Sequence, residues 1–154
     1  MKKLFGVVAL TLLSFSANAG TDPLDFVGDR CAPGDILFYG QTTNHKKEVL
    51  ICQWNTNIFY QFGKLGHEPE LSLKLDVSEV KDLVEDSQTL STESLLIPNG
   101  NVTYKVGHLT DLITNSDIDS VEVIKQGHAH GVEIILDSDT VVNGIRSNFV
   151  KQGY

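Results

Sequence analysis

The sequence predicts an all-β protein: a single-domain antiparallel β-sandwich or flattened barrel with one or two short helices. Three observations support this prediction. Apolar and polar residues alternate with a period of two in several segments, turn motifs join these segments as neighbours, and helical periodicity is confined to short stretches. Alternation places one face of a strand on a core and the other in water, which is typical of antiparallel sheets.

The first two predicted strands differ from the later ones in their patterning. Residues 36–40 ("ILFYG") and 46–54 ("KKEVLICQW") are almost continuously apolar at their centres, so we expect central strands covered on both faces. The later segments alternate instead, which predicts strands with one face in water. The apolar positions of these segments are Leu71, Leu73 and Leu75, then Val102, Tyr104 and Val106, and finally Val132, Ile134 and Leu136.

Turn chemistry connects these strands into hairpins. The turn motifs are "WNTNI" between residues 47–54 and 57–62, the segment 63–69 with Gly63, Gly66 and Pro69, the pair Asn99-Gly100, and the loop between Gly127 and Gly131. An Asn-Gly pair between alternating segments is the strongest short-range hairpin signal. Glycines elsewhere permit the positive φ that many turns require.

Two segments have helical spacing. In residues 76–87 ("DVSEVKDLVEDS"), Asp76 is placed as an N-cap with Glu79 three residues later, and apolar residues follow at helical intervals. This pattern predicts one short helix. Near the C-terminus Val141, Ile145 and Phe149 recur every four residues and predict a second, although Gly144 lowers its helical propensity by about 1 kcal/mol.

The N-terminus has the organisation of a secretory signal peptide. Lys2 and Lys3 precede an apolar run over residues 4–15, and Ala17-Asn18-Ala19 supplies small residues for cleavage. The run is too short to cross a hydrocarbon core of about 30 Å as a helix. We therefore expect residues 1–19 to be removed, and residues 20–154 to form a single β-rich domain with no membrane attachment. The segment resembles bacterial signal peptides, which implies that the domain is periplasmic.

Cys31 and Cys52 are the two cysteines of the chain. In an oxidising compartment such a pair usually forms a disulfide, and closing a loop of this size stabilises a fold by about 3 kcal/mol. A redox pair or a pair of metal ligands are the alternatives. Since the sequence contains no C-x-x-C, the disulfide is favoured.

Composition limits the classes of partner without specifying one, since many secreted domains are acidic for solubility. The formal net charge is −8, and removing Lys2 and Lys3 makes it more negative. Such a field repels nucleic acid and anionic lipid and attracts basic proteins. The chain contains neither the G-x-S-x-G of many hydrolases nor a phosphate-binding Gly-Lys-Ser/Thr loop. We therefore expect no enzymatic activity and no cofactor.

A competing hypothesis uses the histidines. His128 and His130 are two residues apart and could bind zinc with a third ligand such as His108 or Glu133. That arrangement would make the protein a periplasmic metal-binding protein or a small hydrolase. The plainer interpretation is two solvated histidines in a glycine-flanked loop. The acidic run Glu79, Asp82, Glu85 and Asp86 is similarly ambiguous, either a solvated helix face or a negative patch for a basic partner.

The stretches "ICQWNTNIFYQFGKLGHEPELSLKL" and "LLIPNGNVTYKVG" resemble a group of small exported bacterial β-proteins. The shared pattern is a Cys-bearing strand, Tyr-x-Phe-Gly, a Gly-rich link, Pro-Glu-Leu, and later Pro-Asn-Gly with Tyr-x-Val. The matching residues are Cys52, Tyr60, Phe62, Gly63, Gly66, Pro69, Glu70, Leu71, Pro98, Asn99, Gly100, Tyr104 and Val106. The resemblance covers about residues 31–136 and concerns structural motifs. Members often carry a further cysteine where this chain has Gly40.

In size, signal peptide and acidity the chain also resembles periplasmic inhibitors of lysozyme-like enzymes, including immunity proteins against type VI secretion muramidases. This resemblance implies that it binds a basic peptidoglycan hydrolase or secreted effector and blocks its cleft with a hairpin loop. Self-association into a homodimer through an apolar strand edge is a further expectation. The candidate partner-binding residues are Lys64, His67 and Glu68 in one loop, and Asp82, Glu85 and Asp86 in the acidic segment.

Overall fold

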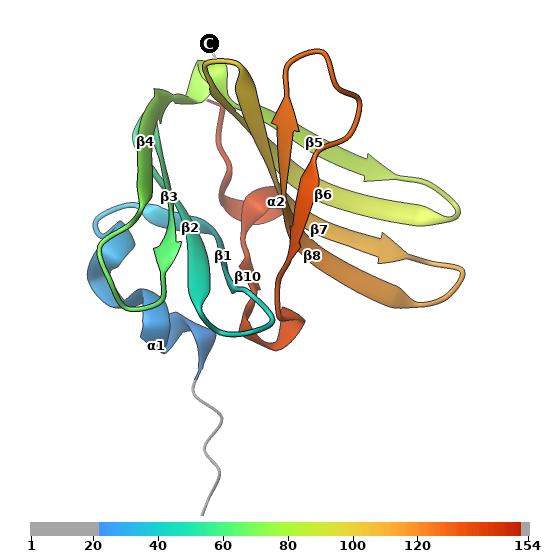
Figure 1. Ribbon diagram of the computed structural model, residues 1–154, viewed down its shortest axis with the longest axis horizontal. Coiled ribbons are helices and arrows are strands. Elements are labelled where there is room, and N and C mark those ends of the chain that lie inside the picture. The colour runs from blue at the N-terminus through green and yellow to red at the C-terminus, as the bar shows by residue number, and fades with distance from the viewer. Residues whose placement is uncertain (1–21, 152–154) are drawn as a thin grey trace, which may run out of the picture.

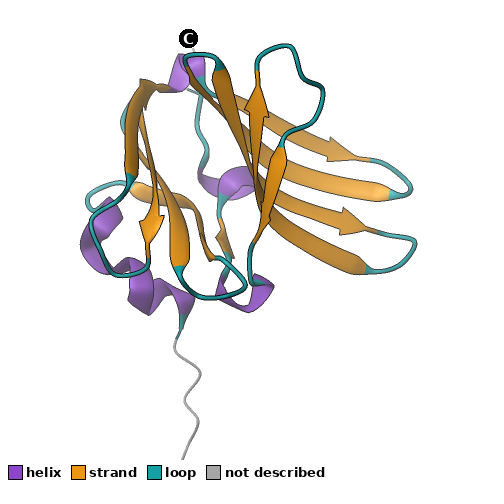
Figure 2. Cartoon of the chain, in the orientation of Figure 1, coloured by secondary structure: helices purple, strands orange, loops and turns teal. Residues whose placement is uncertain are grey.

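The computed structural model describes residues 22–151, which form two five-stranded antiparallel sheets packed face to face (Figures 1 and 2). The first sheet consists of β10 (Val142–Asn143), β1 (Asp35–Gln41), β2 (Lys47–Trp54), β3 (Asn57–Lys64) and β4 (Leu71–Asp76), in that order. The second consists of β5 (Lys81–Asp86), β6 (Leu90–Asn99), β7 (Val102–Asp111), β8 (Ser116–Lys125) and β9 (Val132–Ile135). The predicted all-β sandwich is confirmed.

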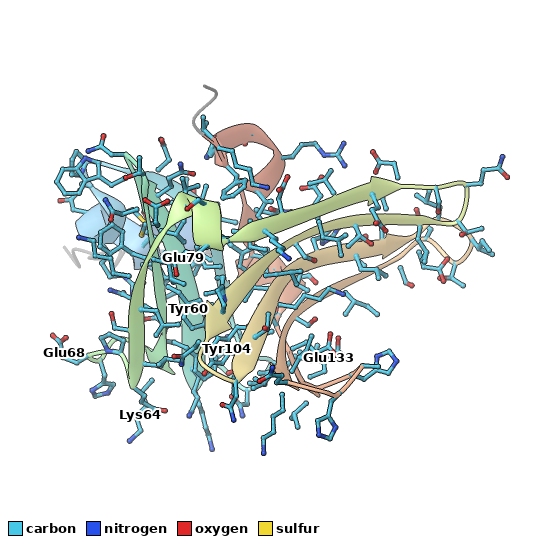
Figure 3. The ribbon with its side chains drawn as sticks, turned by 90° about the horizontal axis from the view of Figure 1, so that it is seen from above. Tyr60, Lys64, Glu68, Glu79, Tyr104 and Glu133 are labelled. Carbon is cyan, nitrogen blue, oxygen red and sulfur yellow. A yellow bond between two sulfur atoms is a disulfide. The ribbon has the colours of Figure 1, made fainter. Side chains whose placement is uncertain are left out.

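The core lies between the two sheets. Inward-facing side chains of the first sheet, such as Ile51 and Ile58, pack with Leu95 and Val106 of the second, and all four are fully buried. At one end of the core, Tyr60 of β3 stacks on Tyr104 of β7 with ring centroids 5.1 Å apart, and Figure 3 shows both rings between the sheets. Burial of the Tyr60 hydroxyl raises the pKa of this residue well above its usual value.

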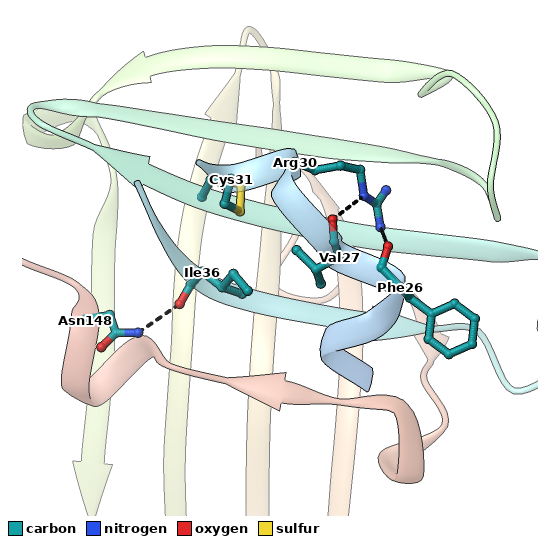
Figure 4. The surroundings of a disulfide bond; sticks show 7 residues. Phe26, Val27, Arg30, Cys31, Ile36 and Asn148 are labelled. Atoms are coloured by element: carbon teal, nitrogen blue, oxygen red, sulfur yellow. Dashed lines mark hydrogen bonds between the residues drawn. A yellow bond between two sulfur atoms is a disulfide. The ribbon is translucent and has the colours of Figure 1, made fainter. Parts of the chain in front are cut away.

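Strands β1 and β2 of the first sheet are covered on both faces, as their continuously apolar sequences predict. The outer face of this sheet carries α1 (Pro23–Val27) and the 3₁₀-helix η1 (Gly28–Cys31), with Val27 packing on Tyr39 and Leu50. The predicted disulfide is present: Cys31 of η1 is bonded to Cys52 of β2, at a Cα–Cα distance of 5.4 Å (Figure 4). The bond therefore attaches the N-terminal segment to the centre of the sheet.

The predicted hairpins are confirmed. Trp54 pairs with Asn57 around a two-residue turn in which Asn55 has a φ of 53°, and Asn99 pairs with Val102 around Gly100, with a φ of 60°. These positive φ values match the twist that tight hairpins need. Longer loops join β3 to β4 and β8 to β9, also as predicted.

The helix predicted over residues 76–87 is wrong. The Asp76–Glu79 capping box forms, but it caps only the 3₁₀-turn η2 (Val77–Glu79). The chain then extends as β5, which pairs with β6 from Lys81 opposite Leu96 to Asp86 opposite Ser91. An isolated helix of this length is marginal in water, whereas pairing with β6 satisfies a full row of backbone hydrogen bonds.

The C-terminal helix exists but is short. It is α2 (Ile145–Asn148), which is preceded by the 3₁₀-turn η3 (Ser138–Thr140), and Ile145 is buried against the core. The Asn148 side-chain amide donates to the Ile36 carbonyl at 3.0 Å, which ties α2 to β1 (Figure 4). Helix α1 was missed by the sequence analysis, although Asp22 as N-cap and Pro23 in the first turn are standard start signals.

No helix within residues 22–151 combines the length and the apolar character needed to cross a membrane. The signal peptide expected over residues 1–19 lies outside the described residues.

The two sheets are joined at one corner of the sandwich. Thr42 forms a β-bridge with Leu136, and the Asp137 N–H donates to the Gln41 carbonyl at 2.8 Å.

Candidate binding site

The loop between β3 and β4 presents three of the predicted partner-binding residues, Lys64, His67 and Glu68, at the surface. Figure 3 shows Lys64 and Glu68 pointing away from the sandwich at the outer edge of the first sheet. The turn itself is closed by the His67 N–H, which donates to the Lys64 carbonyl at 3.1 Å, and Gly66 adopts a φ of 69°.

The neighbouring residues hold this loop in one conformation. Lys47 of β2 forms an ion pair with Glu70 at 2.7 Å, and its hydrogen bond lowers the pKa of the Glu70 carboxyl. The Leu65 N–H donates to the Lys46 carbonyl at 3.0 Å. A side chain at Gly63 would stand 2.6 Å from the Glu70 backbone nitrogen, so the loop packs directly on the strand here. The loop is therefore preorganised.

A concavity, which we call the outer groove, lies between this loop and the N-terminal segment on the outer face of the first sheet. Phe26, Arg30, Glu48, His67 and Glu68 contribute to the lining of its wider part, which has a volume of about 480 Å³. A smaller concavity of about 180 Å³ lies on the other side of Arg30, beside the disulfide, and we include it in the outer groove. That part is lined by Arg30, Cys31, Ala32, Cys52, Trp54, Phe59 and Gln61.

An ion pair forms the floor of the outer groove. Both terminal nitrogens of Arg30 donate to the Glu48 carboxylate, at 2.7 and 3.1 Å, and the guanidinium also donates to the carbonyls of Phe26 and Val27 (Figure 4). The Glu48 side chain is only 7% exposed. It also accepts a hydrogen bond from the Tyr39 hydroxyl at 3.1 Å. A carboxylate held by so many donors is not free to act as a general base.

A chain of polar contacts runs from this ion pair along the sheet. Gln41 donates to the Tyr39 hydroxyl at 2.9 Å, and the Gln41 side-chain oxygen lies 3.1 Å from Nδ1 of His45. Nε2 of His45 is 3.1 Å from the Asp137 carboxylate. Burial, reinforced by the nearby Glu48 charge, raises the pKa of Tyr39 to about 12. These contacts stabilise the groove. Because the polar groups of its floor are paired with one another, the residues that can bind a partner are those of the exposed rim.

The other predicted residues, Asp82, Glu85 and Asp86, lie on β5 at the edge of the second sheet and not beside the loop. Two of these carboxylates have internal cation partners: Asp82 accepts a hydrogen bond from Lys151, and Asp86 pairs with Arg146 at 3.1 Å. These hydrogen bonds lower the pKa of both carboxyls. The structure therefore divides the six candidates between two separate surfaces.

The histidine hypothesis receives no support from the described part of the chain. Residues 22–151 contain no group of three or more histidine, cysteine or acidic side chains placed to hold a metal ion. His128 and His130 lie exposed in the β8–β9 loop. His108, proposed as a third ligand, is occupied elsewhere: its Nδ1 lies 2.9 Å from the Asp119 carboxylate.

The contacts of His108 belong to a polar cluster that the sequence analysis missed. Nε2 of His108 lies 2.9 Å from the Thr110 hydroxyl, which donates to Asp117. Asp119, only 2% exposed, also accepts a hydrogen bond from Ser138 at 2.6 Å. His108 and Asp119 are directly opposite in the β7–β8 ladder, so pairing these two segments in the sequence would have found the contact.

The order carboxylate, imidazole, hydroxyl in this cluster is that of a nucleophilic triad. Two features oppose catalysis. The Thr110 hydroxyl is already committed to Asp117, and β7 is a central strand whose backbone amides are paired with β6 and β8, which leaves no donor pair for an oxyanion. The cluster instead fastens β7 and β8 to η3.

No protein-family model matches the chain, and neither a curated protein nor a solved structure matches it.

Proposed function

We propose that the protein is a periplasmic immunity or inhibitor protein that binds and blocks a peptidoglycan-degrading enzyme, either a lysozyme-like muramidase or a type VI secretion effector of that kind. The observation that carries the proposal is the preorganised β3–β4 loop, which exposes Lys64, His67 and Glu68 beside the outer groove. A loop already held in its binding conformation loses little entropy when it enters a cleft.

The chemistry of the loop suits the cleft of a muramidase. Such clefts contain a pair of carboxyl groups that flank the scissile bond. Lys64 and His67 carry hydrogen-bond donors for these carboxyls, while Glu68 can pair with a basic residue on the rim. The outer groove beside the loop would receive a surface segment of the enzyme, with Phe26 and Trp54 as exposed aromatic contacts.

The charge of the whole chain supports the same partner. The formal net charge is −8, and enzymes that act on the anionic peptidoglycan polymer are often basic. Opposite net charges steer two proteins together and raise association rates by about one to three powers of ten at low salt. Export of the protein would place it in the compartment where such enzymes act.

The direct test is inhibition. Purified protein is added to a basic muramidase, and clearing of a peptidoglycan suspension is followed together with complex formation by isothermal calorimetry. The double variant His67→Ala/Glu68→Ala is expected to weaken inhibition by tenfold or more, because it removes two exposed loop contacts without touching the ion pair of Lys47 and Glu70.

A matched control is available in the other long loop. His128→Ala/His130→Ala removes two exposed histidines of the β8–β9 loop and is expected to leave inhibition unchanged. If the protein neither binds nor inhibits any muramidase or effector of a representative panel, the proposed function is wrong. If the control variant loses inhibition and the loop variant does not, the assignment of the site is wrong.

A further inference from the structure

We call the face of the second sheet that lies toward the first sheet its inner face and the opposite one its outer face. Along the length of the sheet, the side chains of the inner face change from apolar to polar. Where the sheets overlap, the inner face is apolar, with Leu95, Val106 and Val121 in the core. Hairpins β5–β6 and β7–β8 then extend beyond the first sheet (Figure 1). We call this part, residues 82–94 and 107–120, the distal blade.

The inner face of the distal blade is polar apart from Val84, which lies opposite Glu93. In the register of the sheet, Glu93 is opposite His108, which is opposite Asp119, and the next row contains Asp86, Ser91, Thr110 and Asp117. The C-terminal segment binds this face through Arg146, whose guanidinium donates to Glu93 at 2.7 Å and to Asp86 at 3.1 Å. The inner face of the blade is thus satisfied within the chain.

The outer face of the distal blade carries apolar side chains among small or polar ones such as Thr92 and Ser94, and no other part of residues 22–151 forms a layer over it. What we call the outer patch consists of four side chains of the blade, Leu83, Leu90, Leu109 and Ile118, together with Ile135 of the neighbouring β9. Of these, Leu90, Ile118 and Ile135 are each more than 40% exposed. Exposed apolar side chains grouped on one face of a sheet mark an interaction site more often than scattered single residues do.

The centre of the outer patch is hollow. One row across the sheet reads Leu83, Ser94, Gly107, Ser120 and Ile135, so small residues lie between apolar ones. A depression of about 70 Å³ lies over the small residues of this row, and Leu109 and Ile118 line it. Polar side chains complete its lining: Thr92, Lys105, His108, Glu122 and Glu133. A single apolar side chain of a partner could fill it.

The tip of the blade adds two apolar side chains. Leu112 and Ile113 lie in the β7–β8 turn, and Ile113 is 75% exposed. The Asp111 carboxylate accepts hydrogen bonds from the backbone N–H groups of Ile113 and Thr114, at 2.8 and 3.1 Å. These bonds hold the turn in shape, and they lower the pKa of the Asp111 carboxyl.

We propose that the outer patch and the tip form a second protein-binding surface, whose partner presents an apolar knob surrounded by lysine and arginine. The charge of the blade decides the partner. Residues 82–94 and 107–120 contain seven carboxylates and neither lysine nor arginine. Arg146 and Lys151 of the C-terminal segment pair with three of these carboxylates, Asp82, Asp86 and Glu93, so the blade keeps a net negative charge. A second copy of this acidic chain would be repelled, as would an anionic lipid surface, whereas a basic protein is attracted.

This surface is distinct from the β3–β4 loop, which belongs to the other sheet. The inference goes beyond inhibition of a muramidase and does not depend on it. The second surface could bind the same basic enzyme as the loop, or it could bind a different basic protein. The test therefore has to measure binding at the blade separately from binding at the β3–β4 loop.

The test uses site-specific photocrosslinking in cells of the native host. A photoreactive amino acid at position 113 is expected to crosslink a basic protein, which is identified by mass spectrometry and then purified. The same amino acid at position 132 is the control, because Val132 is similarly exposed, at 71%, but lies outside the patch and the tip. The proposal is overturned if position 113 crosslinks no more than position 132, or crosslinks only lipid, an acidic protein or a second copy.

The purified partner then provides a quantitative test. Ile118→Ser and Ile113→Ser are each expected to weaken its affinity by tenfold or more, and Val132→Ser to change it less than twofold, with unchanged unfolding midpoints for all three. Equal effects of the three variants would overturn the proposal. The unmodified protein separates the two proposals: if it inhibits no muramidase while the blade still binds its partner, only the proposed function is lost.

Discussion

Arg30 is the residue on which the floor of the outer groove depends. It neutralises Glu48, whose side chain is only 7% exposed, and also donates to two carbonyls of the N-terminal segment. We expect Arg30→Met to lower the free energy of unfolding by about 2–4 kcal/mol, because it leaves a buried carboxylate without its charge partner. Urea unfolding at neutral pH measures this loss.

The double variant Arg30→Met/Glu48→Gln provides the control. Removing both charges avoids an unpaired buried carboxylate, so most of the stability should return. If the single and double variants are equally destabilised, the guanidinium acts through packing and not through the ion pair.

At the scale of elements, the disulfide attaches α1 and η1 to the first sheet. Cys31 and Cys52 are separated by 21 residues, and closing such a loop restricts the unfolded chain. Cys31→Ala/Cys52→Ala is expected to lower the free energy of unfolding by about 3 kcal/mol in guanidinium chloride. Unchanged stability would mean that packing of Val27 on Tyr39 and Leu50 holds the segment by itself.

The C-terminal segment is attached to β5 by charge, which makes its attachment sensitive to acid. Hydrogen bonds from Lys151 and Arg146 lower the pKa values of Asp82 and Asp86 in the folded protein. Their stabilising contribution is therefore fully present above the unfolded carboxyl pKa of about 4 and is lost as the pH falls through the lower folded values. The free energy of unfolding should decline from about pH 5 downward.

Asp86→Asn isolates this contribution. The variant lacks the carboxyl that pairs with Arg146, so its stability should fall less steeply with acid than that of the unmodified protein. Glu85→Gln, on the other face of the same strand, should leave the slope unchanged. Equal slopes for all three proteins, measured by urea unfolding at a series of pH values, would contradict this origin of the acid sensitivity.

At the scale of the whole molecule, the net charge of −8 should govern the kinetics of association. Raising the salt concentration from about 0.02 to 0.2 M is expected to slow association with a basic hydrolase by about tenfold and to change dissociation little. Biolayer interferometry resolves the two rates. If salt changed only the dissociation rate, short-range ion pairs in the complex, and not long-range electrostatic steering, would account for the salt dependence of binding.

Local patterns were sufficient for much of the architecture. The alternating strands, the Asn99-Gly100 hairpin and the two covered strands each follow from a few neighbouring residues, because strand periodicity and turn chemistry are short-range properties. The Cys31–Cys52 disulfide followed from the presence of only two cysteines. Of the candidate site, the sequence located the exposed loop with Lys64, His67 and Glu68, since glycines and a proline mark it.

The outer groove itself could not be predicted from the sequence. It brings Phe26 and Arg30 of the N-terminal segment against Glu48 and the β3–β4 loop, and no local pattern specifies contacts between such distant residues. Segment 81–86 shows the same limit, because its strand conformation depends on pairing with β6. A helix was an equally good local solution.

By itself, then, the sequence determined an acidic β-rich chain with identifiable turns, one disulfide and one exposed loop. Only the tertiary structure decided that β5 is a strand, that the six candidate residues lie on two surfaces, and that the distal blade is acidic on its inner face and exposes apolar side chains on its outer face. The physical reason is that alternation sets which residues share a face, whereas the packing of the two sheets sets which face is buried.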